Sequence, residues 1–169
     1  LTDERLELLA RSGQRTLVLA PETASVQLAK AIGKPLLRER LLDVAAKARK
    51  IGFKALKLYF MVGLPGEGEI HVKSVAELVK EVAEVSGFKG TRELKLSVSV
   101  FVPKPQTPMQ WFGMDEPERV ARKLRLLKRE LGGLAEVRPY KPAWASVQCV
   151  LSRGGRELTK LLLVWAAAG

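Results

Sequence analysis

A glycine-rich turn directly after an apolar run is the stretch of this chain best suited to bind a ligand. The run Lys57–Val62 is rich in aromatic and branched residues, and a turn with glycines at 63, 66 and 68 follows it. Such a run is typical of a strand in a helix-covered parallel sheet, and the ligands of such sheets lie where strands end and helices begin. Backbone amides of residues 66–68 are therefore expected to face a ligand. A turn of this kind more often only joins a strand to a helix, so it is weak evidence by itself.

Two charged side chains occupy a comparable position earlier in the chain. Glu22 follows a short apolar run, and Lys34 stands twelve residues later in the sequence Ile-Gly-Lys-Pro. Glu22 either binds a ligand or stabilises the start of a helix near Ser25, where an acidic residue is favoured. Lys34 either pairs with an anion or is an ordinary surface lysine. Taken alone, the residues favour the second interpretation in each case.

Strands and helices alternate along the chain, which predicts an α/β fold with parallel strands. The predicted strands are Arg15–Ala20, Ala55–Val62 and Leu94–Val102. The predicted helices are 2–12, Ser25–Ile32, Arg38–Ile51, Ile70–Val85, Asp115–Leu131 and Arg156–Ala167. Pro21 is expected to end the first strand, and Asp115–Glu118 has the pattern of a capping box. A weaker signal predicts a strand at Ser146–Leu151, so residues 1–131 form the predicted main domain and 132–169 an extension.

Alternation within the predicted strands separates an apolar face from a mixed face. The apolar face should meet the helices, and the mixed face should point into a barrel interior or a cleft. The residues expected around this cavity are Glu22, Tyr59, Met61, Ser97, Ser99 and Phe101. Aromatic and methionine side chains in such strands are more often core than ligand-binding wall.

Charge and composition restrict the function classes. The net charge of +11 favours a polyanionic partner such as RNA, although the basic residues alternate with acidic ones at helical spacing, as on a solvated helix surface. Richness in Lys, Arg and Glu is typical of thermophilic proteins. The apolar runs are too short to span a membrane. The chain has a single cysteine, Cys149, which cannot form an internal disulfide, so a reducing cytoplasm is expected. Apolar neighbours in the sequence predict that Cys149 is a buried, inert thiol.

Three segments together resemble the second half of the radical S-adenosylmethionine (SAM) enzyme barrel. Residues 19–25 are similar to that family's fourth strand, residues 61–67 to its glycine-rich fifth strand, and residues 97–111 to its sixth strand and following loop. The resemblance covers roughly residues 1–131 and is strongest to an uncharacterised branch, some members of which carry an upstream cobalamin-binding region. It implies half of a partial TIM-like barrel, and it leaves open whether cobalamin takes part in the parent protein.

The chain departs from this family in two ways. The family binds a [4Fe-4S] cluster through cysteines spaced C-x₃-C-x₂-C, and this chain has only Cys149. It also begins at Leu1 and has no counterpart of the first three strand–helix units. We therefore interpret it as the C-terminal half of a larger iron-sulfur oxidoreductase or transferase, inactive without its N-terminal half. The first strand would then have an exposed edge through which copies can self-associate.

The resemblance also implies roles for individual residues. Glu22 is expected to bind the ribose or methionyl end of SAM, and Lys34 to pair with the methionine carboxylate as a point charge. Tyr59, Met61 and Gly63 are expected to flank the ribose and adenine. The backbone of Val100, Phe101 and Val102 is expected to meet the adenine edge. The substrate stays unknown, and a basic, noncatalytic RNA-binding module is the alternative function.

Overall fold

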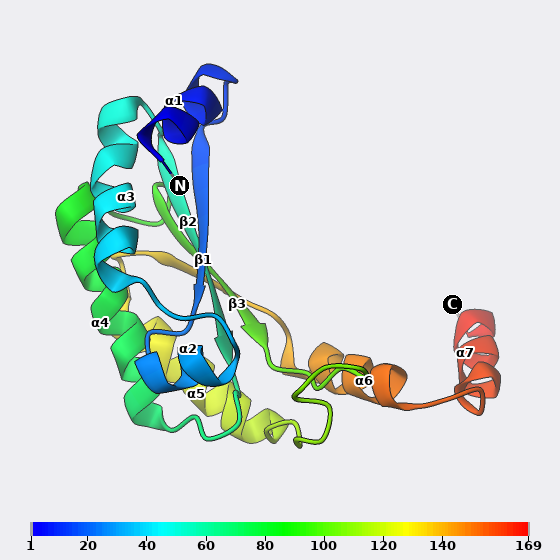
Figure 1. The fold of residues 1–169 in the computed structure, drawn as a ribbon. Helices are drawn as coiled ribbons and strands as arrows, with labels where there is room; N and C mark the ends of the chain where they lie inside the picture. The colour runs from blue at the N-terminus through cyan, green and yellow to red at the C-terminus, as the bar shows by residue number, and fades with distance from the viewer. Residues whose placement is uncertain (1, 169) are drawn as a thin grey trace.

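A single parallel sheet of four strands forms the centre of the protein in a computed structural model, which describes residues 2–168 (Figure 1). The strands are β1 (Thr16–Glu22), β2 (Ala55–Val62), β3 (Leu94–Val100) and β4 (Glu136–Pro139). They lie in the order of the sequence, and each neighbouring pair is parallel. Helices connect them, which confirms the predicted α/β fold and fits half of a partial TIM-like barrel.

The helices cover mainly one face of this sheet. Figure 1 shows α3, α4 and α5 together on one side of the strands. The helices are α1 (Asp3–Arg11), α2 (Val26–Ala31), α3 (Arg38–Ile51), α4 (Glu69–Ser86), α5 (Pro117–Glu130), α6 (Pro142–Arg153) and α7 (Leu158–Ala167). The last two extend away from the sheet as an arm (Figure 1). Among the described residues, no helix has the length and apolarity that crossing a membrane requires.

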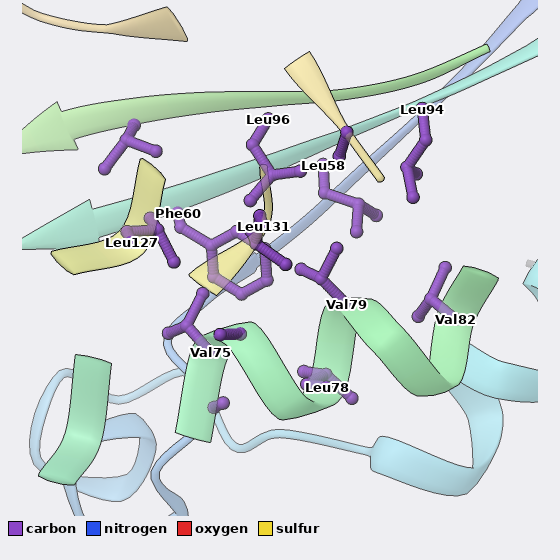
Figure 2. Packing of buried hydrophobic residues seen from close by; sticks show 14 of the residues in the cluster. Leu58, Phe60, Val75, Leu78, Val79, Val82, Leu94, Leu96, Leu127 and Leu131 are labelled. Carbon is purple, nitrogen blue, oxygen red and sulfur yellow. The ribbon is translucent and has the colours of Figure 1, made fainter. Parts of the chain in front are cut away.

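Period-two alternation of apolar residues produces the core. The even-numbered residues of β2 and β3, from Leu56 to Val62 and from Leu94 to Val100, are buried against the helices. Val75, Val79 and Val82 of α4 pack against them, as Figure 2 shows. Burial of each such side chain stabilises the fold by about 1.5–3 kcal/mol. On the opposite face, the odd-numbered residues from Lys57 to Met61 and from Lys95 to Ser99 stay at least partly exposed.

Several predicted boundaries were wrong, for local reasons. Pro21 lies inside β1 rather than ending it, because β1 is an edge strand in which a missing N–H is tolerated. The third strand ends at Val100, two residues early. The helix start at Asp115 has no capping box: Glu116 is the N-cap residue, no side chain caps the helix, and Pro117 takes the first helical position.

The largest errors concern the C-terminal part. The predicted strand at Ser146–Leu151 is part of helix α6, which begins at Pro142 and buries Ala145. Conversely, β4 was missed because its four residues carry no apolar run. It pairs with β3 and therefore adds a strand beyond residue 131 to the main sheet.

Candidate functional site

A cavity of about 680 Å³ lies at the carboxyl ends of β1, β2 and β3. Its volume is within the range of about 300–1,000 Å³ that is usual for small-molecule sites. The predicted site residues that line it are Glu22, Lys34, Met61, Val100, Phe101 and Val102. Ser99, expected on the cavity face, also lines it. The fold therefore brings most of the predicted residues to one place, and their roles in binding stay predictions.

Glu22 and Lys34 form an ion pair at the cavity. The Lys34 ammonium donates a hydrogen bond to Glu22 Oε1 at 2.8 Å. The side chain of Glu22 is 22% exposed, and that of Lys34 is 49% exposed. The family resemblance predicts a ligand contact for each of the two residues, but no pairing between them. The eleven residues between them, 23–33, fold back through α2 and bring the two side chains together.

The local backbone explains how the two side chains meet. Glu22 has φ +66°, a left-handed conformation that is uncommon for residues other than glycine, and the β1–β2 register is irregular between Leu19 and Glu22. A non-glycine residue in this conformation costs on the order of 1–3 kcal/mol, which the surrounding structure must offset. After α2, Gly33 with φ +69° reverses the chain, so that the Lys34 amide donates to Ala29 O at 2.9 Å.

Ser25, rather than Glu22, caps helix α2. The Ser25 side chain accepts a hydrogen bond from the Leu28 amide at 3.3 Å. The alternative interpretation of Glu22 as a helix cap is therefore wrong, and its carboxylate is available to Lys34 and to a ligand.

Part of the cavity lining is apolar and includes Met61, Leu64, Phe101 and Met109. Leu28, Leu64 and Phe101 form a small buried cluster, separate from the main core, with Met61 and Met109 packed against it. Phe101 is buried, and its amide donates to Val62 O at 2.8 Å. That amide is already used, so a ligand would meet the Phe101 ring rather than a free backbone donor.

Two predicted site residues lie outside the cavity lining. Tyr59 is partly exposed on the open face of the sheet, where its hydroxyl accepts a hydrogen bond from the Lys57 ammonium at 2.9 Å. Gly63 adopts φ +81°, and a Cβ atom there would lie 3.4 Å from Asp115 Cβ, so it faces the start of α5. Ser97, expected around the cavity, is also absent from its lining.

A buried charge cluster, which the sequence alone did not predict, lies beside the glycine-rich turn. Lys123 of α5 is only 4% exposed, and its ammonium donates to Glu67 Oε2 at 2.9 Å and to Asp115 Oδ2 at 2.8 Å. It also donates to the Glu67 carbonyl at 3.0 Å. The Glu67 carboxylate accepts in addition from the Gly63 amide at 2.6 Å. Lys123 therefore joins the turn after β2 to the end of the loop after β3.

Burial dominates the protonation of Glu67. It raises the pKa of Glu67, while the hydrogen bonds from Lys123 and Gly63 act in the opposite direction. The signal in the sequence was a lysine placed between Val120 and Leu127 on the apolar stripe of the helix, where a lysine without partners would be costly.

The described residues offer no ligand set for an iron-sulfur cluster. Within residues 2–168, no group of three or more His, Cys, Asp or Glu side chains is placed to hold a metal ion. Cys149 is half-buried on α6, so the prediction of a buried thiol was wrong. The single histidine, His71, is half-buried and accepts a hydrogen bond from the Gly68 amide through Nδ1 at 2.9 Å.

Comparison with known proteins gives three findings. A family model described as the radical SAM superfamily matches residues 1–79. The chain is 30% identical, over 164 residues, to "Uncharacterized protein MJ0966" of Methanocaldococcus jannaschii; the match covers 96% of this chain and 34% of that protein. It is 34% identical over 91 residues to "tRNA-2-methylthio-N(6)-dimethylallyladenosine synthase" of Clostridium botulinum strain Hall, covering 52% of this chain and 20% of that protein. The chain thus spans about a third and a fifth of the lengths of these two relatives.

Proposed function

From the premise that this chain belongs to the radical SAM superfamily, matched over residues 1–79, we propose that its cavity binds S-adenosylmethionine. The observation that carries the proposal is the Glu22–Lys34 pair, held at 2.8 Å at the carboxyl edge of the sheet. A ligand with both a carboxylate and hydrogen-bond donors is complementary to such a pair, and SAM has both.

Each lining residue has a role in this proposal. The Lys34 ammonium pairs with the methionine carboxylate, and the Glu22 carboxylate accepts from the ribose hydroxyls or the methionyl ammonium. The ion pair positions both groups before the ligand arrives. Met61 and Phe101 give apolar surface to the adenine ring. In the family SAM supplies the radical, and the residues of this chain would orient it and exclude water.

We propose that the chain performs this role together with a cluster-binding segment that its described residues do not contain. Their donor set does not fit a [4Fe-4S] cluster, because clusters of this type need several thiolates. The oxidoreductase or transferase reaction is thus a property of the whole enzyme. The chain by itself would be inactive. The link to cobalamin rests on sequence resemblance, and no described residue is assigned to it.

The test is calorimetric titration of the 169-residue chain with S-adenosylhomocysteine, a stable analogue of SAM. Glu22→Ala and Lys34→Ala should each weaken binding about tenfold, equivalent to about 1.4 kcal/mol. The matched controls are Glu77→Ala and Lys80→Ala, which break an ion pair of the same 2.8 Å length on α4, away from the cavity. Unchanged affinity in both cavity variants would reject the site.

RNA binding is a second candidate, favoured by a basic stripe on α5. Arg122, Arg125 and Arg129 surround a shallow hollow beside Glu69. One relative, by its name, acts on tRNA. RNA bound through this stripe should release counterions, so its affinity should fall steeply with salt, and Arg122→Ala/Arg125→Ala should reduce that slope. A salt-independent affinity would reject this candidate.

A further inference from the structure

The cavity carries more positive charge than its proposed cofactor can use. Three lysines and one glutamate line it, and its other lining residues are uncharged. Lys34 is paired with Glu22, so Lys30 and Lys104 supply two positive charges in excess. SAM itself carries a sulfonium and an ammonium against one carboxylate. A second ligand with negative charge would be complementary to the excess.

Lys104 is the better placed of the two excess lysines. It lies in the loop after β3, between Pro103 and Pro105, whose rings restrict the backbone. Thr107 Oγ1 donates to the Lys104 carbonyl at 2.7 Å and closes the turn. The Lys104 ammonium donates to Ser152 Oγ of α6 at 2.7 Å. The side chain is therefore anchored at both ends, whereas Lys30 is exposed at the end of α2.

The anchored ammonium has unused hydrogen-bonding capacity. An ammonium has three donors, and the contact with Ser152 uses one. Among the described residues, no carboxylate lies within ion-pair distance of Lys104. The charge is half-buried beside the apolar residues Val102 and Met109, where an ionic attraction is stronger than in water.

We propose that Lys104, held by Ser152, binds an anionic group of the substrate, a phosphate or a carboxylate. The inference rests on the proposed function, in which Lys34 takes the cofactor's carboxylate. It assigns to this loop, and to the α6 helix that forms the adjoining wall through Gln148, the task of selecting substrates by charge.

The alternative is that Lys104 only connects the loop to α6 and binds no anion. A second connection between the same loop and α6 provides a control for this alternative. Arg153 also ties this loop to α6, because its guanidinium donates to Phe112 O at 3.0 Å. It is exposed and is absent from the cavity lining. Arg153→Met thus removes one positive charge and one tether without changing the cavity.

The experiment is titration of the 169-residue chain with pyrophosphate and with malonate, followed by NMR. Lys104→Met should weaken binding of the preferred anion at least fivefold, whereas Lys104→Arg and Arg153→Met should stay within twofold of the unchanged chain. Preference for one anion then tells phosphate from carboxylate. Equal weakening by Lys104→Met and Arg153→Met, or no saturable binding of either anion, would overturn the assignment.

Titration with S-adenosylhomocysteine on the same samples separates this inference from the proposed function. Lys104→Met should leave that affinity within twofold. A tenfold loss would mean that Lys104 serves the cofactor's carboxylate, which overturns the substrate assignment. Absence of S-adenosylhomocysteine binding to the unchanged chain, with Lys104-dependent anion binding retained, would reject the proposed function alone.

Discussion

Replacement of Lys123 by methionine tests the energetic importance of the buried charge cluster. The change keeps the length and apolar stem of the side chain and removes the ammonium. Glu67, whose side chain is 2% exposed, would then keep only the hydrogen bond from the Gly63 amide. Asp115, at 12%, would keep the guanidinium of Arg119 at 3.4 Å.

The expected loss of stability at about pH 8 is about 3 kcal/mol. Removing one partner of a buried ion pair costs about 3–5 kcal/mol, because the remaining charge is left in a medium of low polarity. The lower end applies here, since Asp115 retains a partner and Glu67 can take up a proton. Urea unfolding followed by circular dichroism measures the change.

The loss should depend on pH in a direction set by Glu67. Burial raises the pKa of Glu67 in the folded state, so uptake of a proton by Glu67 stabilises the fold. This stabilisation is complete below the usual pKa of a glutamate and is lost as the pH rises through the raised pKa. The hydrogen bond from Lys123 lowers the pKa of Glu67, so this pKa should rise further when Lys123 is replaced. The destabilisation by Lys123→Met should therefore be smaller at about pH 5 than at about pH 8.

Two comparisons make the result specific. Adding Glu67→Gln to Lys123→Met removes the unpaired carboxylate, while the amide oxygen can still accept from Gly63, and should restore roughly half of the loss. Lys80→Met, which breaks an exposed ion pair with Glu77, should leave the unfolding midpoint unchanged. A loss below about 1 kcal/mol for Lys123→Met at about pH 8, or one independent of pH, would refute this account of the cluster.

Four other perturbations follow from single features of the fold. Phe60→Ala removes a core ring that is 1% exposed and should cost about 3–5 kcal/mol in urea unfolding. Gly63→Ala forces a side chain into a left-handed conformation beside Asp115 and should cost at least about 1 kcal/mol, whereas Gly13→Ala, also left-handed but with open space around it, should cost less. Ser25→Ala removes the cap of α2 and should cost about 1 kcal/mol, with weaker ligand binding measured by calorimetry. Self-association through the edge strand β1 predicts a concentration-dependent dimer in sedimentation velocity; Val18→Lys on that strand should abolish it, and a monomer at all concentrations would contradict it.

The sequence by itself determined the elements whose signal is local and repeated. Alternation in Ala55–Val62 and Leu94–Val100 was enough to assign both strands and the face that each buries, because side chains alternate strictly along a strand. Glycine positions indicated the ends of helices, as at Gly33 after α2 and Gly52 after α3, whereas Pro21 did not end its strand. The family resemblance of three short segments pointed to Glu22 and Lys34, which taken alone favoured ordinary structural roles.

Only the tertiary structure decided which of these residues meet. The Glu22–Lys34 pair depends on a left-handed backbone at Glu22 and on the chain reversal after α2, neither of which the residue types at these positions require. The strand β4 forms because β3 offers it an edge, so its pairing partner rather than its own residues determines it. Lys123, Glu67 and Asp115 come from three separate segments, and a buried charge is stable only where the fold brings its partners within hydrogen-bonding distance.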